Sequence, residues 1–449
     1  MPDDFGRGAQ TPGTGERAAS AVTQLPATRT VIASVLGNGL EWFDFLSYGL
    51  FAQLIASVFF PETAPSTSLI LAFLVFAVGF VVRPLGGIVF GLYADRAGRK
   101  ASLSAMMVIM AVGSLILALT PSYESIGVAA PLLVVVARIL QGLSVGGEFA
   151  GSAVFLVEHA PPGRRMFYGS LQMCAQGVGI LAASVFAFGL ERSLAPDQLT
   201  EWGWRIPFYA GAIIGPVGLY LRWRIAETPE FTAQRKQKHK ASLQHLPEQM
   251  PAILCGMGLV AAGTSVSYLW HSYLSVYAVR ELHLTRTDAF VALSLSGIVG
   301  ICVYPLAGWL GDRIGAFKVF FWGAGLYALL AWPLYSFIVA SPDLWHLLIA
   351  EFIASVLLGA IIGCHPGLLA ALFPVSVRST GVGLSYNLSV LLFGGLAPAT
   401  VTWLIAKTGS PMMPAIYQIV IVTLAIVLVG ALGSVRRKAQ RANAAAPPH

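Results

Sequence analysis

Two acidic residues, Glu41 and Asp44, stand three positions apart in the stretch GLEWFDFLSYGLF, inside an apolar run. Residues at that spacing share one face of an α-helix. A helix that enters lipid near Ile32 places Glu41 about 14 Å deep and Asp44 about 18 Å deep, near the centre of a hydrocarbon core of roughly 30 Å. Burial and mutual repulsion both favour a protonated carboxyl group. The pair is therefore either a proton carrier that titrates as a unit or a static partner of buried cations.

Two arginines, Arg83 and Arg138, also lie within apolar runs. An arginine at the centre of a membrane helix costs about 2.5–3.5 kcal/mol on insertion scales, and it keeps its charge at any accessible pH. Two fixed positive charges in a water-filled cavity would bind a carboxylate substrate through bidentate hydrogen bonds. The alternative is an internal ion pair with one of the acids, and the candidate partners are Glu41, Asp44 and Glu148.

Glu148 stands in GLSVGGEFAGS, where it is a candidate either for proton coupling or for a structural ion pair. The glycines around it, Gly142, Gly146 and Gly151, predict close helix packing. Further along the chain, Glu351 and Asp343 lie near the outer end of one apolar run, so we expect both at the membrane interface.

Uncharged polar side chains within the apolar runs are candidates to orient a substrate or to bridge helices. They are Gln141, Gln172, Gln176, His365, Tyr386 and Asn387. His365 could gain a proton near neutral pH or serve only in helix packing. The stretch SYLWHSY, at 267–273, corresponds to the first acidic stretch but carries no carboxylate, so proton binding is assigned mainly to the N-terminal half of the chain.

The composition places most of the chain in lipid. Of 449 residues, 56% are hydrophobic and only 11% are charged, whereas a soluble domain carries about 25% charged residues. Twelve apolar runs reach the roughly 20 residues that a spanning helix needs: 31–60, 67–93, 102–120, 127–157, 167–190, 203–221, 250–279, 289–310, 317–340, 344–373, 380–406 and 412–434. Continuous apolarity of this length favours helices over barrel strands. The sequence predicts an all-α, polytopic membrane protein of twelve transmembrane helices in two pseudo-symmetric six-helix halves.

The basic residues predict the orientation. With the N-terminus in the cytoplasm, 21 of the 28 Lys and Arg residues fall on the cytoplasmic side and 5 on the other, so the positive-inside rule favours two cytoplasmic termini. The longest polar break divides the runs into six and six. The expected organisation is a disordered cytoplasmic tail, a first half, a cytoplasmic linker, a second half and a cytoplasmic tail, over residues 1–28, 29–221, 222–249, 250–434 and 435–449.

The two halves repeat a loop. GLYADRAGRK follows the second run and GWLGDRIGAFK follows the eighth, with Asp95 and Asp312 in the same frame. Such duplication predicts a substrate site near the middle of the membrane, between the halves. The loop residues are candidates for a gate that pairs in one conformation and releases in the other, and they are Asp95, Arg96, Arg99, Lys100, Asp312 and Arg313. The second copy has Ala316 and Phe317 in place of two cations, which weakens its charge network.

These motifs resemble those of the major facilitator superfamily. The frame from Gly91 to Lys100 is similar to its loop between helices 2 and 3, RILQG (138–142) to its fourth-helix motif, and ETPEF (227–231) to its helix 6 ending. Within the superfamily, GNGLEWFDFLSYG, GFVVRPLGG, GLSVGGEFAGS, EWGWRIPF and FGGLAPA resemble the metabolite:proton symporter family. That family carries citrate, tricarballylate, 2-oxoglutarate, shikimate, proline and betaine.

The resemblance implies a monomeric bacterial inner-membrane symporter that takes up a small organic acid with protons by alternating access. A di- or tricarboxylate such as citrate or 2-oxoglutarate is the expected substrate. A zwitterionic osmolyte (proline or betaine) and a shikimate-like monocarboxylate are the alternatives, and a non-transporting sensor is a further one. Osmosensing members of that family tend to end in a long coiled-coil tail. The short C-terminal tail of this chain has no heptad pattern, which disfavours that branch. No cofactor, metal or nucleic-acid partner is expected, and the absence of HExxH and GxSxG motifs disfavours an enzyme.

Overall fold

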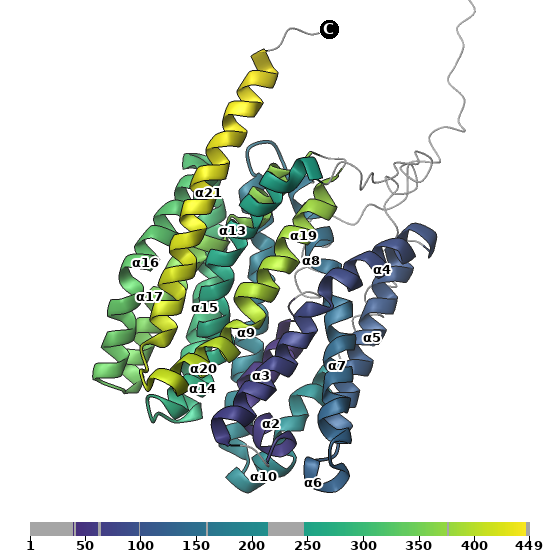
Figure 1. The fold of residues 1–449 in the computed structure, drawn as a ribbon, viewed down its shortest axis with the longest axis vertical. Coiled ribbons are helices and arrows are strands. Elements are labelled where there is room, and N and C mark those ends of the chain that lie inside the picture. The colour runs from purple at the N-terminus through teal and green to yellow at the C-terminus, as the bar shows by residue number, and fades with distance from the viewer. Residues whose placement is uncertain are drawn as a thin grey trace, which may run out of the picture.

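The computed structural model describes residues 39, 42–61, 64–97, 99–158, 160–213, 247–374 and 377–445, without the side chains of 91–92, 94–100, 103, 155, 247 and 434–445. Within these residues the chain forms helices and no strand. The helices run roughly side by side, with the purple-to-blue elements of the first half on the right of Figure 1 and the green-to-yellow elements of the second half on the left. The all-helical architecture expected from the sequence is confirmed for the described residues.

The first half begins with a bent pair of helices and continues through antiparallel helices. Its elements are Trp42–Leu50, α2 (Ala52–Phe59), α3 (Pro65–Val81), α4 (Arg83–Ala97), α5 (Arg99–Leu119), α6 (Tyr123–Ile126), α7 (Ala129–Val145), α8 (Glu148–Glu158), α9 (Arg165–Ser193), α10 (Pro196–Glu201) and the 3₁₀ turn Gly203–Arg205. The opening pair bends by 64° at Phe51. Gly49 lies beside the bend and packs directly on Ser272 of the second half, so the bend occurs where a glycine lets another helix approach.

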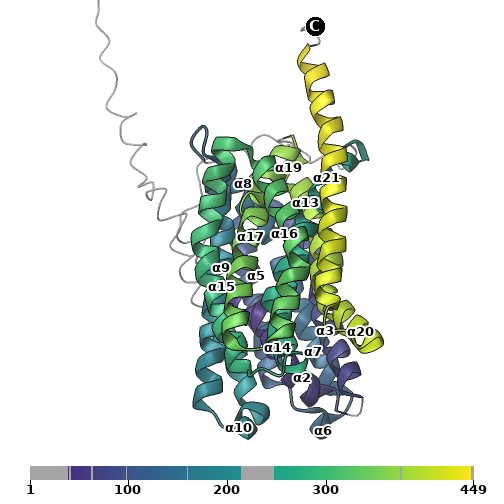
Figure 2. The ribbon, with the colours of Figure 1, turned by 90° about the vertical axis from the view of Figure 1, so that its left-hand side faces the viewer.

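The second half begins at the 3₁₀ turn η3 (Pro247–Gln249). Its elements are α13 (Met250–Tyr268), the π segment η4 (Leu269–Tyr273), α14 (Leu274–Arg280), α15 (Arg286–Leu310), the π segment η5 (Gly311–Gly315), α16 (Ala316–Ala340), α17 (Leu344–Ile362), α18 (His365–Leu372), α19 (Arg378–Val390), the π segment η7 (Leu391–Gly395), α20 (Ala397–Thr408) and α21 (Met413–Ala445). Figure 2 shows α16, α17 and α21 on the outer side of this half.

Eight helices in the described residues are long and apolar enough to cross a membrane, or nine with the bent pair. One of them, Arg286–Ala340, has 55 residues, about 80 Å of straight helix. It therefore holds two crossings, which meet at Gly315, where φ is 101°. Ser104–Leu119 is a shorter apolar helix in the third predicted run. Of the sixth run, only residues up to 213 are described, and the tail 1–28 and most of the linker 222–249 lie outside the described residues.

Helices α9 and α15 hold the halves together along their length, and both figures show them side by side. A Cβ atom placed on Gly177 of α9 would lie 3.1 Å from the backbone nitrogen of Ile301. One placed on Gly297 of α15 would likewise meet the backbone of Leu181. Small residues at such contacts let two backbones approach closely, which is the main source of helix association in lipid.

Glycines also fix the crossing of the second and fourth spans. A Cβ at Gly142 would meet the carbonyl oxygen of Gly79, and one at Gly146 would meet that of Arg83. The predicted packing role of Gly142 and Gly146 therefore agrees with the structure, whereas no atom of the described residues lies within 4 Å of a Cβ at Gly151. This crossing sets the helices that carry Arg83 and Arg138 against each other.

We expect Gly146→Ala to destabilise the fold. Its methyl group would collide with the Arg83 carbonyl, and overpacking of this kind costs about 1–3 kcal/mol. Gly151→Ala is the matched control on the same span, because its methyl group meets no atom of the described residues within 4 Å. Thermal denaturation in detergent should show a lower midpoint for Gly146→Ala alone. Equal midpoints for the two variants would contradict the close crossing.

Candidate functional site

Asp44 is the centre of a buried hydrogen-bond network in the first half. Its side chain is 2% exposed, and Oδ2 accepts hydrogen bonds from Ser114 Oγ and Gln141 Nε2, each at 2.7 Å. Oδ1 has no hydrogen-bond partner among the described residues. Gly211, from the sixth predicted run, lies directly against that oxygen. Three spans therefore position one carboxyl group, and one of its two oxygens has no donor among the described residues.

Gln141 connects this carboxyl group to a buried cation. Arg138 Nη1 donates to Gln141 Oε1 at 2.7 Å, while the amide nitrogen of Gln141 donates to Asp44. The two residues stand three apart on α7, so they share one face of that helix. The amide of Gln141 uses both of its ends here: its oxygen accepts from the positively charged Arg138, and its nitrogen donates to the carboxyl group of Asp44. Arg138 Nε and Nη2 are buried and make no hydrogen bond in the described part of the chain.

Aromatic rings surround both arginines. The Cζ atom of Arg83 lies 4.7 Å and that of Arg138 lies 4.5 Å from the centre of the Phe45 ring. Arg83 also lies 4.3 Å from the Phe80 ring, and Arg138 lies 4.8 Å from the Tyr48 ring. Contacts between a cation and a ring face offset part of the cost of burying the charge. Because one ring contacts both cations, their Cζ atoms are at most about 9 Å apart.

The second half covers this cluster from the other side. Tyr268, the last residue of α13, packs against Phe80 with ring centroids 5.3 Å apart. Tyr386 on α19 stacks on Phe149 at 3.5 Å, and Asn387 Nδ2 donates to the Gly146 carbonyl at 3.0 Å. The cluster therefore lies at the interface between the halves, the position that the internal repeat predicts for a substrate site.

The structure brings together only some of the residues singled out in the sequence. Asp44, Arg83, Arg138 and Gln141 form one cluster, whereas Glu41 lies outside the described residues. Glu148 is buried at the start of α8, beside the contact between Phe149 and Tyr386.

The other polar candidates lie further along the same interface or within the second half. Gln176 Nε2 donates to Ser267 Oγ across the halves at 3.0 Å. Gln172 is buried, and neither atom of its amide has a partner in the described residues. His365 is buried against Gly263 of α13 and near the Phe320 ring of α16, so it lies inside the second half.

Sequence reasoning placed Glu351 wrongly. Its side chain is 0% exposed, because residue 351 lies two turns inside α17, on the face that packs into the second half. Asp343 is exposed, as expected, and caps α17 by accepting the His346 N–H at 2.9 Å. That backbone hydrogen bond lowers the pKa of Asp343. Sequence reasoning also did not single out Ser114 or the rings around the arginines. The one signal for the rings was that Phe45 and Tyr48, three residues apart, share a helix face with Glu41 and Asp44.

One end of the molecule carries two polar contacts between the halves. Asp312 accepts the backbone N–H groups of Met166 and Phe167, both at 2.9 Å, at the N-terminus of α9. At the same end, Arg378 Nη1 lies 2.6 Å from Glu158 Oε1. Arg313 is exposed and lies over the Trp309 ring of its own half. The side chains of Asp95, Arg96, Arg99 and Lys100 lie outside the described residues.

The opposite end is also closed by contacts between the halves. Arg280 Nη2 donates to Ser66 Oγ at 3.0 Å, and Ser275 Oγ donates to the Leu50 carbonyl at 3.2 Å. With both ends in contact, the described residues enclose the charge cluster instead of opening it to either side.

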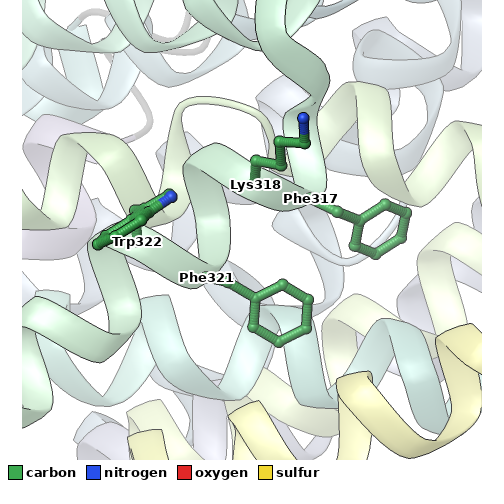
Figure 3. A pocket seen from close by; sticks show the side chains of 4 residues that line it. All are labelled: Phe317, Lys318, Phe321 and Trp322. Atoms are coloured by element: carbon green, nitrogen blue, oxygen red, sulfur yellow. The ribbon is translucent and has the colours of Figure 1, made fainter.

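A hollow of about 400 Å³ lies elsewhere, on the surface of α16. Figure 3 shows the side chains that line it, and they are Phe317, Lys318, Phe321 and Trp322. Trp322 is 75% exposed. Aromatic rings together with a lysine are typical of a helix surface at the lipid–water boundary, so this hollow is separate from the buried cluster. The described residues contain no group of side chains that could hold a metal ion.

Comparison with known proteins identifies close relatives. Residues 29–251 match the family Sugar (and other) transporter, and residues 255–448 match the Major Facilitator Superfamily. The citrate-proton symporter of Salmonella typhi is 38% identical over 383 residues, which cover 84% of this chain and 87% of that protein. The proline/betaine transporter of Escherichia coli (strain K12) is 32% identical over 416 residues, or 89% and 82% of the two chains.

Solved structures share the fold. The xylose transporter XylE from E. coli, in a partially occluded inward open conformation, superposes with a TM-score of 0.73 at 18% identity and covers 89% of this chain and 96% of that chain. The D-xylose-proton symporter gives 0.72 at 19% identity, with 89% and 97% covered. The expected architecture of twelve helices in two halves is thereby confirmed.

We expect Asp312→Ala to loosen the contact at the N-terminus of α9. The variant removes two hydrogen bonds to a charged acceptor, each worth about 1.5–3 kcal/mol, so the open population at that end should rise at least about tenfold. Buried Cys364, which donates to the Ala307 carbonyl near Asp312, reports the opening through its rate of maleimide labelling, measured by peptide mass spectrometry.

The matched control for that experiment is Asp343→Ala. Asp343 also accepts a backbone N–H at a helix start, but within its own half. Its removal should leave labelling of Cys364 unchanged. If both variants label at the wild-type rate, Asp312 is not a gate contact.

Proposed function

Because this chain belongs to the metabolite:proton symporter family of the major facilitator superfamily, we propose that it takes up a small organic anion, a di- or tricarboxylate such as citrate, together with protons. The chain is a multi-pass membrane transporter of a family that works by alternating access around a central site. The observation that carries the proposal is the buried connection from Asp44 through Gln141 to Arg138.

Charge balance explains how this connection couples a proton to an anion. The buried charged side chains of the described first half are Arg83, Arg138, Asp44 and Glu148. When Asp44 takes up a proton, its negative charge is lost and the two arginines carry an excess of positive charge. A substrate carboxylate restores the balance, and a charge pair at about 4 Å contributes about 4 kcal/mol at an effective dielectric constant of 20. Proton and anion therefore favour each other's binding, as symport requires.

The arrangement of the two cations favours a substrate with more than one carboxylate. Arg83 and Arg138 contact the same Phe45 ring, so their guanidinium groups are at most about 9 Å apart. Arg138 has two nitrogen atoms and Arg83 has one that lack partners within the described residues. Carboxylates form bidentate hydrogen bonds with such groups. A di- or tricarboxylate can form hydrogen bonds with both guanidinium groups, whereas a single carboxylate reaches only one of them.

A zwitterion such as proline or betaine is the second candidate. Relatives named proline/betaine transporters are 32–33% identical to this chain, and aromatic rings recognise quaternary ammonium groups well. Tyr268, Phe76 and Phe80 pack together beside the arginines. A zwitterion would place its carboxylate on one arginine and its ammonium group among these rings.

The remaining features of the proposed transporter follow from the chain and its relatives. The named relatives come from bacteria, which supports the bacterial inner membrane as the location, and the distribution of basic residues supports cytoplasmic termini. The proposed halves are 29–221 and 250–434, joined by the linker 222–249. The carrier works as a monomer, with the proton gradient as its energy source and no cofactor. Glu41 and Glu148 are proposed to assist proton binding.

We expect Asp44→Asn to abolish citrate accumulation but to retain exchange. Asparagine resembles the protonated acid in shape and accepts the hydrogen bond of Ser114, but it cannot release a proton. Proteoliposomes with an alkaline interior should therefore accumulate citrate with the wild type and only equilibrate it with the variant. Exposed Asp197 provides the control Asp197→Asn, which should behave as the wild type. Proton-driven accumulation by Asp44→Asn would remove this residue from the coupling mechanism.

We expect Arg138→Gln to weaken citrate binding by about 30-fold or more, because the loss of one partner of a buried charge pair costs about 2–5 kcal/mol. Calorimetric titration of the purified protein with citrate measures the effect. The control is Arg205→Gln, since Arg205 lies away from the cluster, where it caps helix α5 through the Ala118 and Thr120 carbonyls and lies over the Trp204 ring. If the same titration shows that the wild type binds betaine or proline but not citrate, the zwitterion is the substrate instead.

A further inference from the structure

The second half contains a buried acid that the proposed coupling mechanism does not use. Glu351 on α17 is 0% exposed. Ser355 Oγ donates to its Oε1 at 3.4 Å, a long hydrogen bond, and Oε2 has no partner among the described residues. The ion pairs in the described part of the chain involve other acids. An ionised carboxylate so deeply buried, without a cation and with weak donors, is costly, so this group binds a proton.

A chain of hydrogen bonds leads from this acid to the interface between the halves. Ser355 Oγ lies 2.6 Å from Ser296 Oγ on α15, which lies 2.9 Å from His271 Nε2. On the other side of the ring, His271 Nδ1 lies 3.0 Å from Ser267 Oγ. Ser267 in turn accepts the Gln176 amide of the first half at 3.0 Å. All these side chains are buried, so the hydrogen bonds form a continuous polar path through an otherwise apolar bundle.

The chemistry of the path suits proton movement. A hydroxyl group both donates and accepts, and a neutral imidazole takes a proton on one nitrogen while it releases one from the other. His271 lies in the π segment η4, an interruption of regular helix that is frequent at functional sites. For a proton to leave Glu351, Ser355 first turns its hydroxyl hydrogen from the carboxyl group toward Ser296 and then accepts the carboxyl proton. Each hydrogen along the path then moves by one position. One proton then emerges at Ser267, and a carboxylate remains at Glu351.

Other titratable groups around Glu351 come from each helix packed against α17. Tyrosines of α15 and α16 lie close enough to sense its charge, and they are Tyr304, Tyr327 and Tyr335. Helix α13 carries Cys255 and Tyr268. Helix α15 carries Arg286 and Asp288 in its first turn and Cys302 further along, and the first turn of α16 carries Lys318. Arg286 pairs with Glu191 at 3.8 Å. No cation in the described residues makes an ion pair with Glu351, so its proton is the charge that balances it.

We propose that Glu351 is a second proton-binding group of this carrier, and that Ser355, Ser296, His271 and Ser267 conduct its proton to the interface between the halves. This inference rests on proton-coupled transport as the function and extends it to the second half. With Asp44 and Glu351 both loaded, two protons accompany one substrate anion. The proton on Glu351 is released when the opening of the interface hydrates Ser267.

Infrared spectroscopy tests the acid without any substrate. The purified full-length wild type should show a carboxylic acid C=O band that Glu351→Gln lacks and that bleaches as the pH is raised. The matched control Glu191→Gln, at a partly exposed acid that pairs with Arg286, should keep the band. Absence of this band from the wild type, or its persistence through the whole pH range in which the protein stays folded, would overturn the proposal even if citrate is not the substrate.

Transport tests the coupling and the path. In proteoliposomes, the proton-to-citrate ratio from reversal potentials should fall by one in Glu351→Gln, while citrate exchange persists. An unchanged proton-to-citrate ratio in Glu351→Gln would mean that Glu351 is a neutral acid that takes no part in coupling. Absence of citrate transport by the wild type would instead refute the proposed substrate. Ser296→Ala, which interrupts the path, should slow proton-coupled uptake several-fold, whereas the control Ser294→Ala on the same helix should not. Equal rates for the two serine variants would exclude the path.

Discussion

The cost of burying charge in an apolar bundle is the constraint on which this structure depends. Arg83 and Arg138 are fully enclosed, and lipid-facing helices offer them no water. Aromatic ring faces compensate the charge of both arginines, and Asp44 compensates that of Arg138 through Gln141. Neither kind of contact saturates the donors of a guanidinium group, and three of their nitrogen atoms have no partner in the described residues. A site that is almost but not fully neutralised is suited to an anion that arrives with a proton.

Close helix packing makes that arrangement possible. Gly142 and Gly146 let α7 cross the second span with backbone contact at Gly79 and Arg83. A larger residue at either position would push the arginine-bearing helices apart and expose the charges to lipid or to each other. The positions of the charges are therefore set by residues that carry no charge, and the same is true at Gly211, which lies directly against Asp44.

Hydropathy and charge were enough to predict much of the fold and part of the site. The twelve runs and the charge cluster of Asp44, Arg83 and Arg138 follow from the high cost of polar groups in lipid, which restricts where such residues occur. The division into two halves followed from the repeated loop that contains Asp95 and Asp312. Helix rotation does not follow from hydropathy, because a run that is apolar all round gives no preferred face. For that reason Glu351 was assigned to the interface from its distance along the run alone. The pairing of Asp312 with the start of α9 was likewise hidden, since it joins helical segments that are far apart in the sequence.

Helix α13 connects the two polar regions that the structure contains. Ser267 ends the hydrogen-bond path from Glu351 and contacts Gln176, while the next residue, Tyr268, packs on Phe80 beside Arg83. The π segment that follows interrupts the regular helix directly after these two residues. A rocking movement of one half against the other would separate Ser267 from Gln176 and Tyr268 from Phe80 in the same step. The end of α13 would thus have two arrangements, and both the path from Glu351 and the arginine cluster would influence which one is populated. A shared two-state element of this kind is the physical basis for coupling between two sites. Proton release in the second half and exposure of the arginines in the first would then belong to a single conformational change.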